Sequence, residues 1–142
     1  MKKIVFVCLG NICRSPMAEF VMKNLIKQSG CDADFQIESR ATSSWEHGNP
    51  IHPGTQRIFE EKGIEFDLTK SSQQITARDF EAFDQIIAMD ESNLEKLKQL
   101  APEGTAHKIQ MLLEQSVPDP WYTGDFEETY SLISKGCRQF LD

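Results

Sequence analysis

The chain has 142 residues and a net charge of -7, with 39% hydrophobic and 26% charged residues. This length favours a single domain over residues 1–142, and the composition is typical of a globular protein rather than a disordered or fibrous one. Because Lys and Arg form no long run, the negative charge argues against nucleic acid as a partner. An anionic substrate must therefore be attracted by local charges.

The N-terminal region does not have the pattern of an export signal. The apolar run Ile4 to Val7 is too short for one and is not followed by a cleavage site. No stretch is long enough to span a membrane, so we expect no membrane association and a cytoplasmic location. We expect the four cysteines to be reduced thiols there. The Cys and His residues lack the spacing of metal ligands, and we expect no metal and no other cofactor.

The first predicted elements are a strand and a helix. Lys3 to Val7 form a β-branched and aromatic run, typical of a buried central strand. Ser15 can cap a helix with Pro16 at its first position, because apolar residues follow at helical spacing. Ser29 and Gly30 should end this helix.

A second strand and a second helix follow, separated by a long loop. Phe35 and Ile37 alternate with polar residues, as in a strand, and a polar loop runs from about Ser39 to His52. Loops of this length usually serve a site. Pro53 to Lys62 is predicted to be a helix, with Gly63 past its end.

Two more strands are predicted in the second half. Thr76 and Asp79 have the spacing of a capping box at the start of a short helical turn. Gln85 to Met89 is the third strand and Lys108 to Leu112 the fourth. Between them, Asp90 should cap a helix with an apolar face of Leu94, Leu97 and Leu100.

The alternation of strands and helices predicts an α/β fold. We expect a three-layer α/β/α arrangement with a four-stranded parallel sheet, doubly wound and Rossmann-like, whose ligands bind at the carboxyl ends of the strands. Cys8 lies at such an end. The last helix should begin near Asp125, and the prolines in Val117 to Tyr122 should keep that segment from continuing either neighbouring element.

The segment between the first strand and the first helix predicts a phosphate-binding loop, Cys8-Leu9-Gly10-Asn11-Ile12-Cys13-Arg14-Ser15. Successive backbone N–H groups can converge there on one anion at a helix N-terminus. Gly10 and Asn11 suit left-handed backbone, and Arg14 can hold two phosphate oxygens at once. The same donors, with the Ser15 hydroxyl, would stabilise a thiolate at Cys8 as a nucleophile. Taken alone, Cys8 and Arg14 are more often a buried core thiol and a solvated helix-start residue.

Cleavage of a phosphate ester also needs a proton for the leaving oxygen. Asp119, between two prolines, is the candidate acid, although an Asp in that context is also a common turn residue. Nucleotide-binding glycine motifs of the Walker and dinucleotide types are absent, which argues against nucleotide binding.

The motif from Cys8 to Ser15, the following P-M-A-E and the D-P-W-Y at Asp119 to Tyr122 resemble the low-molecular-weight protein tyrosine phosphatases. The likeness extends over nearly the whole chain, including A-T-S from Ala41, G-N-P from Gly48 and M-D-E-S-N from Met89. It implies hydrolysis of phosphotyrosine in other proteins, with inorganic phosphate as product. Cys8 would form a phosphocysteine, Arg14 and the loop amides would hold the phosphate oxygens, and Asp119 would act as acid and then as base.

The resemblance also implies supporting roles near the loop. Asn11 would hydrogen-bond Ser39 and hold the backbone of the loop. Asp90 would orient the loop from beneath, or simply cap its helix. Cys13 would form a reversible, protective disulfide with Cys8, or simply fill the loop.

Three aromatic residues are implied to bind the substrate. Trp45, Trp121 and Tyr122 would wall a deep slot that admits phosphotyrosine in preference to the shorter phosphoserine, although such residues are more often mere packing. One segment departs from the family pattern, because many members carry a His and an Arg shortly before Gln-Ile-Thr, where this chain has Thr69 to Thr76. We expect a network through that His to be changed or absent, and we do not assign its role to Lys70.

Three rival functions remain. Protein-arginine phosphatases with a similar loop have Thr in place of Ile12, so Ile12 favours phosphotyrosine. Thiol-dependent arsenate reductases need two further closely spaced cysteines, whereas Cys31 and Cys137 lie on or beside predicted helices. A catalytically silent phosphate-binding module is the non-enzyme alternative. The joint presence of four residues argues against it: Cys8, Arg14, Ser15 and Asp119.

Overall fold

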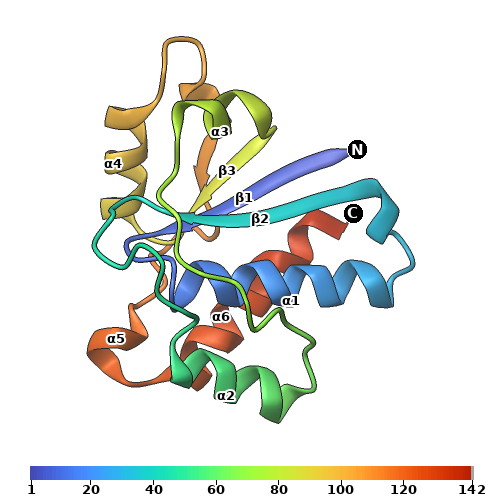
Figure 1. Ribbon diagram of the computed structural model, residues 1–142. Coiled ribbons are helices and arrows are strands. Elements are labelled where there is room, and N and C mark those ends of the chain that lie inside the picture. The colour runs from blue at the N-terminus through green and yellow to red at the C-terminus, as the bar shows by residue number, and fades with distance from the viewer. Residues whose placement is uncertain (142) are drawn as a thin grey trace.

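The computed structural model describes residues 1–141 and has a four-stranded parallel sheet at its centre (Figure 1). The strands follow the order β2-β1-β3-β4 across the sheet. Their bounds are Lys2–Cys8 for β1, Phe35–Ala41 for β2, Gln85–Ala88 for β3 and Ile109–Met111 for β4. The predicted parallel α/β fold is confirmed, and β1 lies between two neighbours as a central strand should.

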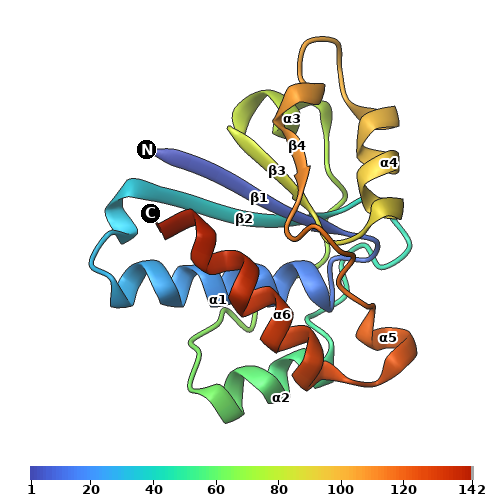
Figure 2. The same cartoon turned by 180° about the vertical axis from the view of Figure 1, so that it is seen from behind.

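Helices cover both faces of the sheet (Figure 2). One face is covered by α1 (Arg14–Gln28), α2 (Pro53–Lys62) and α6 (Phe126–Arg138), and the other by α3 (Ala77–Ala82) and α4 (Glu91–Leu100). The strand β1 serves both layers, because Ile4 and Phe6 belong to the first core and Val5 and Val7 to the second. No helix within residues 1–141 is long and apolar enough to cross a membrane.

Several helix ends follow the signals in the sequence. The helix α2 begins at Pro53 and ends at Gly63, which has a left-handed φ of 68°. Thr76 and Asp79 form the predicted capping box of α3, and Asp90 caps α4 by accepting a hydrogen bond from the backbone N–H of Asn93.

Two local predictions were wrong. The helix α1 begins at Arg14, so Ser15 lies inside its first turn and does not cap it. The strand β2 continues to Ala41, which puts Ser39 inside the sheet rather than in a loop. As predicted, the segment before α6 continues neither β4 nor α6. It forms a short helix of its own, α5 (Pro120–Thr123), because Pro120 is compatible with the first helical position and Asp119 caps it.

Candidate active site

The loop between β1 and α1 wraps around the sulfur of Cys8, which is only 3% exposed. The backbone N–H groups of Asn11 and Ser15 point to Sγ at 3.3 Å and 3.4 Å, and the Ser15 hydroxyl oxygen lies 3.1 Å from it. Donors placed in this way stabilise negative charge on sulfur or on a bound oxyanion. This geometry suits a nucleophilic thiolate.

Asn11 holds the loop in a conformation that few residues adopt. Its φ of 55° lies in the left-handed region, which Asn tolerates better than most residues. Its side-chain amide donates to Ser15 Oγ at 2.7 Å and to Ser39 Oγ at 3.0 Å, and its Oδ1 accepts from the backbone N–H of Gln73. The predicted contact between Asn11 and Ser39 is therefore present. Asn11 and Ser15 lie behind the loop and do not line the pocket.

A buried charged cluster supports this contact from behind. Glu19 is 2% exposed and accepts a hydrogen bond from Ser39 Oγ at 2.5 Å and another from Lys23 Nζ at 2.6 Å. Lys70 Nζ lies 3.4 Å from Glu19 Oε1 and donates to the carbonyl of Ser39 at 3.0 Å. Burial lowers the pKa of Lys70, and the neighbouring Glu19 carboxylate opposes that shift. Lys70 thus occupies a place behind the loop that the sequence did not assign to it.

Arg14 is buried beneath the pocket, with 2% exposure. One guanidinium nitrogen donates to Asp90 Oδ2 at 2.7 Å and to the carbonyl of Val117 at 2.9 Å, and the other lies 3.4 Å from Asp119 Oδ2. Burial alone would lower the pKa of Arg14, but the charges of Cys8, Asp90 and Asp119 outweigh it and the pKa is raised. Asp90 therefore both caps α4 and fixes the orientation of Arg14.

Asp119 stands at the wall of the pocket at the start of α5. Its Oδ1 accepts from the backbone N–H of Trp121 at 3.0 Å, and its side chain is 21% exposed. The carboxyl group is thus held in place yet remains accessible from the pocket. A carboxyl group in this place can exchange a proton with a bound ester.

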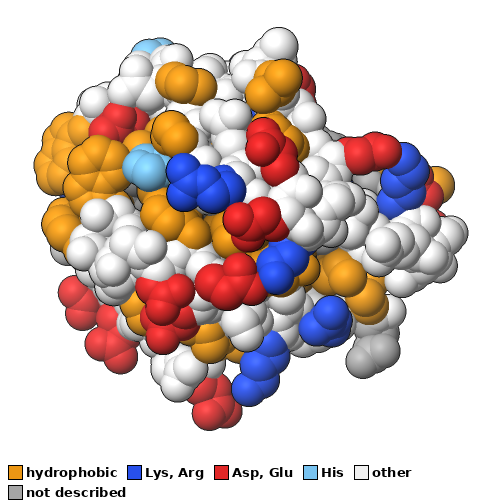
Figure 3. Space-filling view, turned by 90° about the horizontal axis from the view of Figure 1, so that it is seen from below, with side chains coloured by type: hydrophobic (Ala, Val, Ile, Leu, Met, Phe, Trp, Pro, Cys, Tyr) orange, Lys and Arg blue, Asp and Glu red, His pale blue; other side chains and the backbone are white. Residues whose placement is uncertain are grey.

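These groups line one pocket of about 210 Å³. Its floor contains Cys8 and Arg14, and Leu9, Gly10, Ile12, Cys13 and Asp119 also line it. Its rim is aromatic, because Trp45, Trp121 and Tyr122 line it and are 79%, 56% and 78% exposed. Hydrophobic side chains gather at this end of the molecule, over α5 (Figure 3). The structure thus brings the three predicted aromatic residues to one opening.

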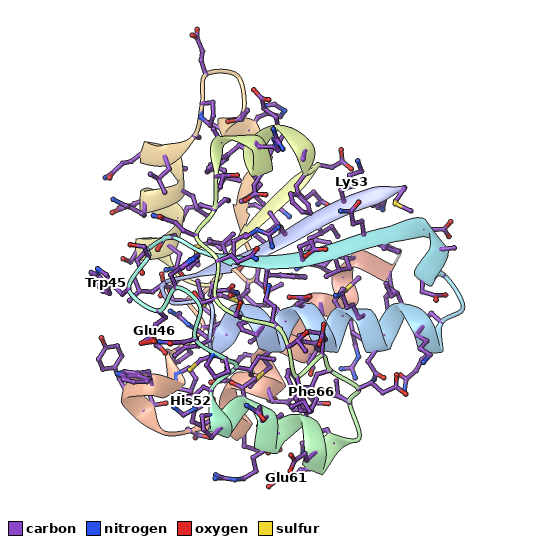
Figure 4. All side chains as sticks on the ribbon, viewed as in Figure 1. Lys3, Trp45, Glu46, His52, Glu61 and Phe66 are labelled. Carbon is purple, nitrogen blue, oxygen red and sulfur yellow. The ribbon has the colours of Figure 1, made fainter. Side chains whose placement is uncertain are left out.

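Two residues of the rim were not found by sequence reasoning. Glu46 lines the pocket beside Trp45 (Figure 4) and packs so closely on Gly10 that a Cβ there would lie 3.2 Å from Glu46 Cγ. His52 makes an edge contact with Trp121, with ring centroids 5.6 Å apart, and stacks on Phe126 at 5.1 Å. His52 therefore helps to position α5. An acidic residue beside a loop tryptophan was a visible signal for Glu46, whereas no pattern in the sequence pointed to His52.

The other cysteines differ from Cys8. Cys13 is buried, and its pKa is raised by burial first and then by the nearby Cys8 and Asp119. Cys8, Cys13, Cys31 and Cys137 are all free thiols. Within residues 1–141 there is no group of three or more His, Cys, Asp or Glu side chains that could hold a metal ion.

A thiol at the end of a parallel strand, ringed by amides and joined by a buried arginine and an accessible carboxyl group, defines a site of the cysteine-dependent phosphatase class. The model of the family described as low molecular weight phosphotyrosine protein phosphatase matches residues 3–142. The chain therefore belongs to this family of hydrolases.

Individual relatives agree with this assignment. The low molecular weight protein-tyrosine-phosphatase YfkJ of Bacillus subtilis is 42% identical over 99% of this chain and 94% of its own length. The crystal structure of SP-PTP from Streptococcus pyogenes has a TM-score of 0.93 at 57% identity and covers 99% of this chain and 91% of that one. A structure described as a Drosophila arginine phosphatase has a TM-score of 0.89 at 32% identity, with 99% and 96% covered.

Proposed function

We propose that this protein hydrolyses phosphotyrosine in other proteins, through a phosphocysteine on Cys8, in a single catalytic domain formed by residues 1–142. The observation that carries the proposal is the convergence of loop N–H groups on Cys8 Sγ, directly beside the buried Arg14. The relatives named tyrosine phosphatases at 41–42% identity support the substrate class.

In the first step the Cys8 thiolate attacks phosphorus, so that an S–P bond forms as the P–O bond to the tyrosyl ring breaks. Asp119 gives its proton to the leaving phenolic oxygen. The loop amides and the guanidinium of Arg14 hold the three equatorial oxygens, where charge is concentrated in the transition state. The contacts of Arg14 with Asp90 and Val117 keep its planar fork in place for this purpose.

In the second step a water molecule attacks the phosphocysteine. Asp119, now a carboxylate, takes the proton of that water, the S–P bond breaks, and Cys8 leaves as a thiolate. The hydrogen bonds from Asn11 N and Ser15 N stabilise this leaving group, and the Ser15 hydroxyl, which accepts from the Cys8 thiol at 3.1 Å, can turn to donate to the thiolate. Inorganic phosphate is the product, and no cofactor takes part.

The pocket supports an aromatic ester over a short aliphatic one. The thiol lies at the bottom, and the exposed rings of Trp45, Trp121 and Tyr122 rise around the opening. A phenyl ring reaches from the rim to the floor and packs on aromatic walls, whereas phosphoserine is too short to fill this depth.

The test is hydrolysis of p-nitrophenyl phosphate with EDTA present and no metal added. We expect activity to survive chelation, to disappear in Cys8→Ser, and to fall by about 10²-fold or more in Arg14→Ala and Asp119→Ala. An inactive wild type, or activity retained in Cys8→Ser, would overturn the proposal. The substrate class is then decided by comparing the rates at which the wild type hydrolyses a phosphotyrosine peptide and a phosphoarginine peptide. Faster hydrolysis of phosphoarginine would contradict the assignment to tyrosine.

A further inference from the structure

A second hollow lies on the far side of Trp45 from the catalytic pocket. It has a volume of about 410 Å³ and lies between the loop after β2 and the first turns of α4, which run side by side (Figure 1). We call it the α4 groove, and the residues that matter here are Leu9, Ser43, Ser44, Trp45, Asn93 and Lys96.

The α4 groove is continuous with the catalytic pocket. Leu9 and Trp45 line both hollows, so a chain whose side chain enters the pocket can continue past Trp45 into the groove. The Leu9 part of this shared wall is held in place, because the carbonyl of Leu9 accepts hydrogen bonds from Ser43 N at 3.2 Å and Ser43 Oγ at 2.8 Å. A wall held in this way gives the bound chain a defined path.

Asn93 supplies an acceptor that lacks a partner. It lines the groove at 3% exposure, and its Oδ1 makes no hydrogen bond to any of residues 1–141. Buried acceptors in folded proteins nearly always have a donor, since leaving one unpaired is costly. This oxygen has less than 1 Å² of accessible surface, so a backbone N–H of a bound peptide reaches it once the Asn93 amide rotates towards the groove.

Lys96 gives the groove its charge. It is the one charged residue among those that line the groove, and no carboxylate in the described part of the chain lies within ion-pair distance of it. Glu91 and Glu95 of the same helix do not line the groove. On the other side of Trp45 the charge is reversed, because Glu46 lines the catalytic pocket. The two sides of the rim thus favour opposite charges.

We propose that the α4 groove binds the residues that flank phosphotyrosine in the substrate protein, with Lys96 pairing with an acidic side chain and the Asn93 amide rotating to accept a backbone N–H. This inference rests on the proposed function and adds a sequence preference to it. An acidic residue is favoured on the side of phosphotyrosine that runs over the groove. On the opposite side, towards Glu46, it is disfavoured.

The experiment uses phosphotyrosine peptides with one Glu placed in turn at each flanking position in an otherwise Ala and Gly sequence. We expect Glu to raise kcat/KM about two- to fivefold on one side only. Lys96→Gln should abolish this preference. In Lys96→Glu, a peptide with Lys at the favoured flanking position should replace the Glu peptide as the better substrate. The matched control is Lys98→Gln, on the same helix but outside the groove, which should keep the wild-type preference.

Hydrolysis of p-nitrophenyl phosphate separates this inference from the proposed function. It should be unchanged in both Lys96 variants, because this small ester reaches only the catalytic pocket. If the wild type hydrolyses it but shows no preference among the peptides, or if Lys96→Gln keeps the preference, the groove proposal is wrong while the phosphatase assignment stands. If the wild type does not hydrolyse it, the proposed function itself has failed.

A binding measurement tests the place of contact. In the inactive Cys8→Ser variant, the acidic phosphopeptide should shift the backbone amide resonances of residues 92–96, whereas inorganic phosphate alone should not. Equal shifts with both ligands, or none with the peptide, would contradict binding in the groove.

Discussion

The floor and the rim of the pocket are built in different ways. Cys8 and Arg14 on the floor, and Asn11 directly behind it, are at most 3% exposed, and each makes several hydrogen bonds. At the rim, Trp45 and Tyr122 are more than three-quarters exposed. A floor of this kind fixes charges within tenths of an ångström, which catalysis of phosphoryl transfer requires. An exposed rim contributes contact area and selectivity instead.

The largest effect should come from the floor, in Arg14→Lys. The charge is kept, but a lysine cannot hold two phosphate oxygens at once or keep the contacts with Asp90 and Val117. We expect kcat for p-nitrophenyl phosphate to fall by about 10³-fold. Circular dichroism would check that the variant is folded. A folded variant that keeps a tenth of wild-type activity would show that the two-point contact of the guanidinium with phosphate is not needed.

A smaller loss should follow in Asn11→Gly. Glycine keeps the left-handed backbone but loses the hydrogen bonds to Ser15 and Ser39, each worth about 1 kcal/mol, or about fivefold in rate. We expect kcat to fall about 10- to 100-fold. Asn11→Ala adds the cost of left-handed backbone, about 1–2 kcal/mol in the free energy of unfolding measured with urea. If Asn11→Gly and Asn11→Ala have equal free energies of unfolding, the left-handed backbone at position 11 is not strained.

At the rim, Trp45→Ala should act on recognition and hardly on chemistry. We expect KM for a phosphotyrosine peptide to rise about three- to tenfold, as loss of one aromatic contact implies, with kcat for p-nitrophenyl phosphate nearly unchanged. Leu68→Ala is the matched control, since Leu68 is 72% exposed and does not line the pocket. A large loss of kcat in Trp45→Ala would mean that a rim residue acts on the chemical step, as the floor residues do.

The smallest effect concerns the cluster behind the floor, in Lys70→Met. Because Glu19 keeps Lys23 and Ser39 as partners, we expect the free energy of unfolding at neutral pH to change by only about 1 kcal/mol.

The pH dependence of this change has a definite sign. Burial lowers the pKa of Lys70 in the folded protein below its ordinary value of 10.5. Between the two values the unfolded state binds more protons than the folded one, so the wild type should gain stability relative to Lys70→Met as the pH rises towards 10.5. Urea unfolding of both proteins at neutral pH and at about pH 10 measures this. A relative loss of stability over that range would contradict the buried position of Lys70.

Much of the floor could be predicted from the sequence because it is local. Cys8 to Ser15 are consecutive, and the strand before them and the helix after them are visible in the apolar pattern. Ser15 shows the limit of this reasoning. Its place before Pro16 predicted a helix cap, but tertiary structure places its hydroxyl on Cys8 and Asn11 instead.

The rest depends on contacts between distant segments. Glu19 and Lys70 are 51 positions apart by their numbers and meet only because β2 brings Ser39 between them. The α4 groove likewise requires the loop after β2 to lie beside Lys96. Single-sequence patterns carry no information on such pairs, so the supporting cluster and the groove emerge only from the folded chain.

The most direct test of the phosphocysteine mechanism is to trap the intermediate. Asp119→Ala should be mixed with p-nitrophenyl phosphate, quenched within the first turnover and digested, and the peptide containing Cys8 analysed by mass spectrometry. The predicted result is one phosphoryl group on Cys8, absent when Cys8→Ser is combined with Asp119→Ala. Release of p-nitrophenol with no phosphoryl group on the enzyme, or with one on another residue, would contradict Cys8 as the nucleophile.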